Sequence, residues 1–236
     1  EAGDIITELE GLVLATDGTL ADYCDILRSR APDDVMAIEV LRFSTEEVLE
    51  GQLNGDALVQ SFSFAQELSD EATTTDEGAA ESYTDYVSIS DDTGTLTMDV
   101  PAEWSDINGT AWTQDDEEIG RALSASPDLD GYNNTWEVPG VFFGVSEQLT
   151  MTVEEYLDSI DFSESCTFDS RSDYSDGVYT GFYDLWIDCG DAGSSFVVIA
   201  AKPEDGSYMA LVQVQVVGDA DLDAVDRIMN TFIYVP

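Results

Sequence analysis

The last third of the sequence contains three long apolar segments, which constrain the fold more than any other feature. They read VYTGFYDLWIDCG, SSFVVIAAKP and YMALVQVQVV, and turns bearing Gly, Ser and Asp separate them. Such segments with short connections predict an antiparallel meander of three strands. The segment DADLDAVDRIMNTF then predicts a closing helix, with Asp219 or Asp221 as its N-cap. Its apolar face comprises Leu222, Val225, Ile228, Met229 and Phe232. The sequence therefore predicts an α+β domain, in which helices cover an antiparallel sheet.

Upstream segments extend this domain. Two strands are expected around the turn at residues 91–94, because Leu96, Met98 and Val100 alternate with polar residues. GVFFGVSEQL predicts another strand, and TVEEYLDSI predicts a helix that Thr152 caps. The apolar face of this helix comprises Val153, Tyr156, Leu157 and Ile160.

The order of these elements resembles the PsbP-like fold. The shared features are an opening hairpin, a Val-Pro-x-x-Trp corner, a late three-stranded meander and a C-terminal helix; here the corner is VPAEW at residues 100–104. The resemblance covers residues 84–236. It implies a fold and no particular chemistry, because that fold serves many non-enzymatic accessory and binding modules.

The first 58 residues predict a separate group of short strands and one helix. AGDIITELEG predicts a strand and a tight turn, DGTLADYCDILRSR a helix, and VMAIEVLRF and STEEVLEGQL two further strands. This series is similar to the second half of the PDZ domains that follow the protease domain in the high-temperature-requirement (HtrA) family of trypsin-like serine proteases. The residues that carry the resemblance are Gly3-Asp4-Ile5-Ile6, Gly11 and Leu41-Arg42.

The resemblance implies that residues 1–58 form part of a peptide-binding domain. In that family a peptide C-terminus docks between a strand and a helix, and backbone N–H groups of a glycine-containing loop hold its carboxylate. That loop is expected before Glu1, so a partial PDZ domain is predicted. On its helix, Ala21 and Tyr23 are the candidate peptide contacts, although Tyr23 fits equally well as an ordinary half-buried aromatic. Residues 59–83 predict an acidic linker.

The charge balance limits the partners. The chain has 51 acidic and 7 basic residues, a formal net charge of −44. Such a chain repels nucleic acid and anionic lipid, so neither is an expected partner. No apolar run approaches the ~20 residues of a membrane span. Two explanations of the acidity remain, adaptation to a salty medium and cation binding; the even spread of the carboxylates favours a halophilic source.

Histidine is absent from the chain. Its absence excludes Ser-His-Asp and Cys-His catalysis and His-ligated zinc within these residues. A carboxylate-based hydrolase remains conceivable because Asp and Glu are abundant. The sequence predicts a non-enzymatic chain with no cofactor.

Three cysteines are present. Cys166 and Cys189 are near enough in sequence to bridge neighbouring strands, which predicts a disulfide and an extracytoplasmic, oxidising location. The alternative is two unrelated buried thiols. Cys24 would then remain unbridged.

Two further groups of residues are candidate sites. Asp128, Asp130 and Asn133 surround Gly131 with oxygen donors suited to a hard cation, or form an Asx-rich turn. A second group could line a ligand-binding face or belong to the core. Its members are Tyr174, Tyr179, Phe182, Tyr183 and Trp186.

These observations lead to two hypotheses. The first is a non-catalytic regulatory or substrate-binding C-terminal region of a secreted or envelope-tethered trypsin-like serine protease, which recognises peptide or protein C-termini through its PDZ portion. The alternative is a free-standing envelope module that binds a small ligand, a sugar or a cation.

Overall fold

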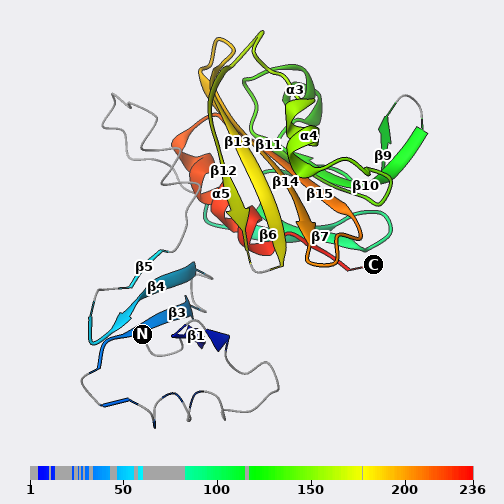
Figure 1. Cartoon of the computed structure of the whole chain (residues 1–236). Helices are drawn as coiled ribbons and strands as arrows, with labels where there is room; N and C mark the ends of the chain where they lie inside the picture. The colour runs from blue at the N-terminus through cyan, green and yellow to red at the C-terminus, as the bar shows by residue number, and fades with distance from the viewer. Residues whose placement is uncertain are drawn as a thin grey trace. The chain divides into compact units, whose positions relative to one another are not determined.

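A computed structural model of the chain (Figure 1) describes residues 5–10, 12–13, 23, 26, 28, 30–31, 34–42, 47–55, 58–60, 83–114, 117–176 and 178–235. The chain divides into two compact units, Glu1–Ser63 and Phe64–Pro236.

The first unit contains a five-stranded antiparallel sheet in the order β2-β1-β3-β4-β5. Its strands are β1 (Ile5–Leu9), β2 (Leu12–Val13), β3 (Met36–Arg42), β4 (Glu47–Leu53) and β5 (Val59–Gln60). The strands β1, β3 and β4 lie where the sequence predicts them. Strand β5 adds the first two residues of the expected linker to this sheet, and residues 61–82 lie outside the described part of the chain.

One face of this sheet forms a small core. Met36, Ile38 and Val40 alternate along β3 and are buried together with Leu9 of β1. This alternation is expected where a strand has one buried face. Of the expected helix at residues 17–30, the described residues Tyr23, Ile26 and Arg28 are helical, and Arg30 is not. Its other residues lie outside the described part of the chain.

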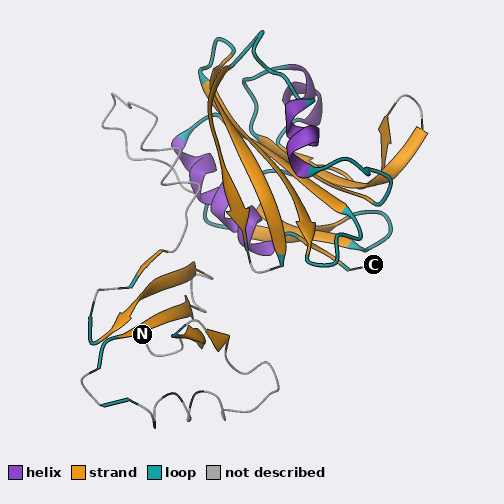
Figure 2. Ribbon diagram, in the orientation of Figure 1, coloured by secondary structure: helices purple, strands orange, loops and turns teal. Residues whose placement is uncertain are grey.

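The described residues of the second unit form two antiparallel sheets and three helices (Figure 2). The larger sheet has the order β12-β13-β14-β15-β11-β10-β8, and β9 also pairs with β10. Its strands are β8 (Asp106–Asn108), β9 (Ala111–Gln114), β10 (Glu117–Ser126), β11 (Gly140–Ser146), β12 (Thr167–Ser175), β13 (Tyr179–Cys189), β14 (Ser194–Pro203) and β15 (Met209–Val216). The smaller sheet comprises β6 (Tyr86–Ser90), β7 (Leu96–Pro101) and β16 (Ile233–Tyr234). The helices are α3 (Leu129–Asn134), α4 (Val153–Asp158) and α5 (Asp219–Thr231).

The two faces of the larger sheet bury different cores. On one face, α5 and the smaller sheet pack against β13, β14 and β15, and Trp104, Val225 and Ile228 are completely buried there. On the other face, α3 and α4 cover a second core that includes Leu157 and Trp186. Helices α3 and α4 lie together and away from α5 in Figure 1. Because both faces are covered, the central strands are apolar on both sides, which explains the continuous apolar segments in the sequence.

These observations confirm the predicted α+β architecture at a coarse level. The meander β13-β14-β15, the β6–β7 hairpin and the helices α4 and α5 occur where they are predicted. Thr152 caps α4 through a capping box with Glu155. The strands β8, β9, β10, β12 and β16 and the helix α3 are not among the elements that the sequence predicts.

The predicted N-cap of α5 is wrong. Gly218 is the N-cap residue, and Asp219 is already in the first turn. Asp221 instead reaches back from the third helical position, where its Oδ2 accepts hydrogen bonds of 2.9 Å from the backbone N–H groups of Val217 and Gly218. A carboxylate at this position satisfies N–H groups that precede the helix and also complements the positive end of its dipole.

Candidate ligand-binding site

A pocket of about 290 Å³ opens on the side of the larger sheet that α3 covers. Its floor consists of side chains from three neighbouring strands. Gln213 and Gln215 occupy alternate positions on β15 and therefore lie on the same face. Phe142 of β11 is the register partner of Gln213, and Phe196 of β14 is the register partner of Gln215. The floor thus places two amides between two phenyl rings.

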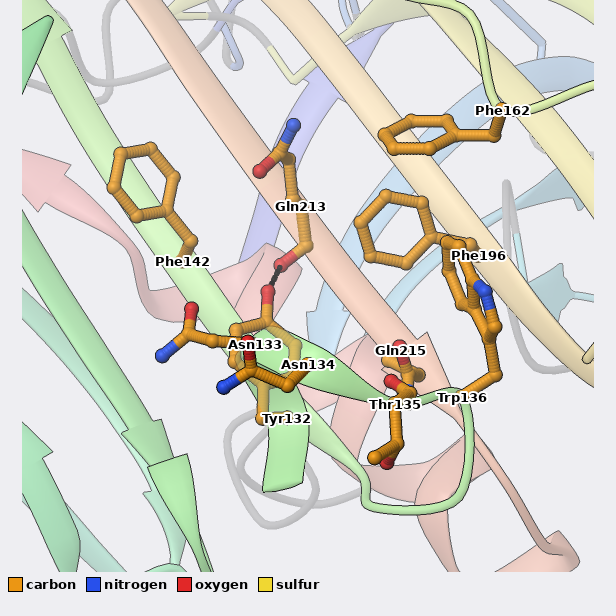
Figure 3. A pocket seen from close by; sticks show the side chains of 10 residues that line it. All are labelled: Tyr132, Asn133, Asn134, Thr135, Trp136, Phe142, Phe162, Phe196, Gln213 and Gln215. Carbon is orange, nitrogen blue, oxygen red and sulfur yellow. Dashed lines mark hydrogen bonds between the residues drawn. The ribbon is translucent and has the colours of Figure 1, made fainter. Parts of the chain in front are cut away.

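Helix α3 and two loops supply the walls. We call the site the amide pocket, and its lining comprises Tyr132, Asn133, Asn134, Thr135, Trp136, Phe142, Phe162, Phe196, Gln213 and Gln215. Figure 3 shows Gln213 in the middle, with Phe142 on one side of it and Phe162 and Phe196 on the other. The residues therefore surround a shared space, although they come from five separate segments of the chain.

Hydrogen bonds to the floor hold the wall in place. The Nε2 of Gln215 donates to the backbone oxygens of Val138 (2.8 Å) and Thr135 (3.3 Å). The hydroxyl of Tyr132 donates to the backbone oxygen of Gln213 at 3.3 Å. Gln215 is 1% exposed, so its amide would be costly to leave unpaired. These bonds fix the loop that carries Trp136.

Two glycines allow the wall to approach the sheet. A Cβ atom at Gly140 would lie 2.6 Å from the Tyr132 ring, and a Cβ atom at Gly190 would lie 2.8 Å from Trp136. Gly190 also has a φ of +59°, a conformation that glycine adopts without strain. Larger residues at either position would displace the wall.

Three rings form a cluster that we call the aromatic wall: Trp136 and Phe162 from the loops and Phe196 from the floor. Every pair among them is edge-to-face, with ring centroids 5.1 to 5.6 Å apart. This geometry is favourable for aromatic quadrupoles, so the three rings stabilise one another's positions.

The amide pocket is electrically neutral. None of the described residues that line it is an Asp, Glu, Lys or Arg. Burial raises the pKa of Tyr132, so its phenol stays protonated. The site therefore offers amides, hydroxyls and aromatic surface, which bind and orient a ligand, and no acid or base with a pKa suited to proton transfer near neutral pH.

The disulfide lies next to this site. Cys166 and Cys189 are bonded, with their Cα atoms 4.1 Å apart, as predicted. The backbone N–H of Cys166 donates to the oxygen of Phe162 at 2.8 Å, and the N–H of Gly190 donates to the oxygen of Ser165 at 2.9 Å. The disulfide thus anchors the loop that carries Phe162 to the end of β13.

The candidate cation ligands take part in helix capping. Asp128 is the N-cap of α3, and its Oδ1 accepts from the N–H groups of Asp130 and Gly131 at 3.1 and 3.2 Å. Asn133 donates from Nδ2 to the backbone oxygen of Leu129 at 2.6 Å. Among the described residues, no group of three or more His, Cys, Asp or Glu is arranged to hold a metal ion.

The aromatic residues noted in β12 and β13 do not share one face. Tyr174, Tyr179 and Tyr183 belong to the core beneath α5. Phe182 and Trp186 belong to the opposite core, beneath α3 and α4. Four of the five are buried, and Phe182 is partly buried. They therefore pack the two cores and do not form one ligand-binding face.

Of the candidate peptide contacts, Tyr23 is half-buried and packs against the core of the first sheet. Ala21 lies outside the described residues.

No protein-family model matches the chain, and no curated protein matches it in sequence. The site must therefore be interpreted from its own residues. None of the helices in the described part of the chain has the length and apolar character needed to cross a membrane.

The amide pocket is not among the sites that the sequence predicts. One signal was available: Gln213 and Gln215 interrupt the apolar segment MALVQVQV at alternate positions, on one face of a central strand. Two uncharged polar residues at such positions indicate a partner or a cavity on that face.

Proposed function

We propose that this chain is a non-catalytic, ligand-recognising region of an extracytoplasmic trypsin-like serine protease. One observation carries the ligand-recognising part of the proposal: a pocket in the second unit is lined by amides and aromatic rings and has no charged group among its described lining residues. Such a lining suits binding, because aromatic surface can contact a ligand while polar groups fix its orientation. The protease domain would be another part of the same polypeptide.

The first unit supports the peptide-binding part of this proposal. Its order of strands, with helical residues between β2 and β3, agrees with the resemblance to the second half of a PDZ domain. Peptide C-termini would then be the ligands of this unit. The PsbP-like assignment of residues 84–236 is likewise part of the proposal.

The disulfide supports the location. Structural disulfides form and persist in oxidising compartments and are rare in the reducing cytosol. The bond between Cys166 and Cys189 therefore favours a secreted or envelope-tethered protein.

The test compares the parent protein with a variant that lacks residues 1–236. We expect the deletion to leave kcat for a short chromogenic peptide unchanged, because the catalytic residues lie elsewhere. It should raise the KM for an unfolded protein substrate several-fold, because these residues recognise it. A parent reading frame without a His, Asp and Ser catalytic set would overturn the proposal.

The amide pocket favours a second candidate function, a binding module without an attached protease. In that case the isolated second unit would bind its ligand as tightly as the whole protein does. The parent protein would then show no protease activity, with or without residues 1–236.

A further inference from the structure

Side-chain amides are concentrated in the amide pocket. The chain has five Asn and seven Gln residues, and four of these twelve line this one site. Asp and Glu, which number 51, are absent from its described lining. In a chain whose polar surface is mostly carboxylate, this composition indicates selection for a neutral hydrogen-bonding ligand.

The protein itself uses most of the N–H groups of these amides. Asn134 donates from Nδ2 to the backbone oxygen of Asp130 at 2.8 Å, Asn133 donates to that of Leu129, and Gln215 donates to two backbone oxygens. The groups that remain on these three side chains are their carbonyl oxygens, which accept, and one N–H of Asn133. The side chain of Gln213 makes no hydrogen bond to any residue that the structure describes, so it can both donate and accept. The pocket therefore suits a ligand with several donors.

The aromatic surface requires that this ligand also has an apolar face. In Figure 3, Gln213 projects between Phe142 and the aromatic wall. A sugar ring has this amphipathic character, because its C–H groups pack against aromatic rings while its hydroxyls reach amides. The volume of about 290 Å³ is near the lower end of the ~300–1,000 Å³ of small-molecule sites, which fits one ring better than a long chain.

Neither an anionic nor a cationic ligand suits this pocket. The net charge of −44 disfavours an anionic ligand. A bound cation would be stabilised by carboxylates, or by several aromatic ring faces directed at one point. The lining has no described carboxylate, and the three rings of the aromatic wall contact one another edge-to-face.

We infer that the amide pocket binds one neutral sugar ring of a saccharide, with Gln213 as its main hydrogen-bonding residue and Phe142 and the aromatic wall as its apolar contacts. This inference rests on the proposed role of the second unit in ligand recognition.

The test is a titration followed by ¹⁵N–¹H NMR of the whole chain at high salt. The probes are glucose, galactose, mannose and N-acetylglucosamine, added separately at millimolar concentrations. At least one of them should cause saturable shifts of the side-chain NH₂ of Gln213 and the indole N–H of Trp136. Gln213→Ala should weaken this binding at least tenfold, and Gln114→Ala, which alters an exposed glutamine of β9, should leave it unchanged.

Several outcomes would overturn the inference. These are no saturable shift with any of the sugars, equal affinity in Gln213→Ala, equal binding of glucuronate, or saturation of the same signals by tetramethylammonium alone. If Gln213→Ala does not fold, Gln213→Glu replaces it. This substitution keeps the size of the side chain but replaces its amide with a carboxylate, which has no N–H donor for the sugar. C-terminal peptides are titrated in parallel: peptide binding without sugar binding would sink this inference and leave the proposed function standing.

Discussion

The hydroxyl of Tyr83 donates a hydrogen bond of 2.7 Å to Oδ1 of Asp221, although the two residues lie at opposite ends of the second unit's sequence. The same hydroxyl accepts from Nε1 of Trp104 at 3.1 Å. Asp221 uses its other oxygen for the backbone before α5. Tyr83 therefore links the Val-Pro-x-x-Trp corner to the start of the closing helix.

Removal of this hydroxyl should destabilise the second unit. Tyr83→Phe removes a hydrogen bond to a carboxylate and leaves the buried Trp104 indole without its acceptor, so we expect a loss of about 1.5–3 kcal/mol in the free energy of unfolding. Urea denaturation measures it. The control is Tyr156→Phe on α4, because that hydroxyl makes no hydrogen bond to a described residue. The control should change stability by less than about 0.5 kcal/mol. Equal effects of the two substitutions would contradict the role of Tyr83.

A second prediction concerns Arg171. Its guanidinium donates to both carboxylate oxygens of Asp184, at 2.6 and 2.8 Å, and to Oδ1 of Asp158 at 2.7 Å. The Asp184 side chain is 3% exposed, whereas that of Asp158 is 69% exposed. Arg171→Met leaves the buried Asp184 carboxylate without its counter-ion, and we expect a loss of about 3–5 kcal/mol.

The exposed carboxylate provides the matched control. Asp158→Asn removes an ion pair that solvent screens, so it should cost less than about 1 kcal/mol. The double variant Arg171→Met/Asp184→Leu should recover most of the loss, because a packed apolar pair of similar size replaces the buried charges. Thermal and urea unfolding of the three variants measure these differences. A double variant as unstable as Arg171→Met would refute the explanation that the unpaired Asp184 carboxylate causes the loss.

A third prediction follows from the β6–β7 turn. Asp91 is buried, which opposes its ionisation, but hydrogen bonds from Thr93 and from the backbone N–H groups of Leu96, Thr95 and Thr93 outweigh this effect and lower its pKa. A carboxyl whose pKa is lower in the folded state stabilises that state above the unfolded pKa of about 3.9. This contribution is lost as the pH falls through the lower folded pKa.

The pH dependence of one variant tests this linkage. The stability difference between the wild type and Asp91→Asn should be constant at pH 5–7, decrease as the pH falls below about 4, and reach its smallest value at the lowest pH. Because other carboxylates titrate in both proteins, the difference isolates Asp91. Asp92→Asn, an exposed neighbour, should differ from the wild type by less than about 0.5 kcal/mol. A difference for Asp91→Asn that stays constant down to pH 2 would show that Asp91 is not involved.

The charge of the chain predicts a strong salt dependence. At a net charge of −44, self-repulsion destabilises the compact state, and salt reduces it. The thermal midpoint should therefore rise as NaCl increases from about 0.1 M to about 1 M, over which the Debye length falls from about 10 Å to about 3 Å. Sucrose of equal osmolality is the control for effects other than screening. A similar rise in sucrose would argue against an electrostatic origin.

The sequence predicts those elements in which the spacing of apolar residues matches the buried faces of the strand or helix. The meander and α5 were found because their apolar residues follow the period of a covered strand or helix. Strand β12 was missed, since its polar segment TFDSRSDYS is a strand through its pairing with β13. The amide pocket was missed for a related reason: Gln213 and Gln215 indicate which face has a cavity, but the positions of Trp136 and Phe162 depend on how distant loops return to the sheet.

The last prediction joins the disulfide to the amide pocket. Denatured, unreduced protein should titrate with one free thiol, that of Cys24, because Cys166 and Cys189 are bonded. Cys166→Ser/Cys189→Ser should lower stability by about 2–4 kcal/mol, because the unfolded chain regains the freedom of the 23-residue separation. It should also weaken binding at the amide pocket, because the loop from Phe162 to Cys166 loses its covalent attachment to β13. Cys24→Ser is the matched control and should leave binding unchanged. Binding of unaltered affinity in the double variant, measured where it is fully folded, would show that the position of Phe162 does not depend on the bond.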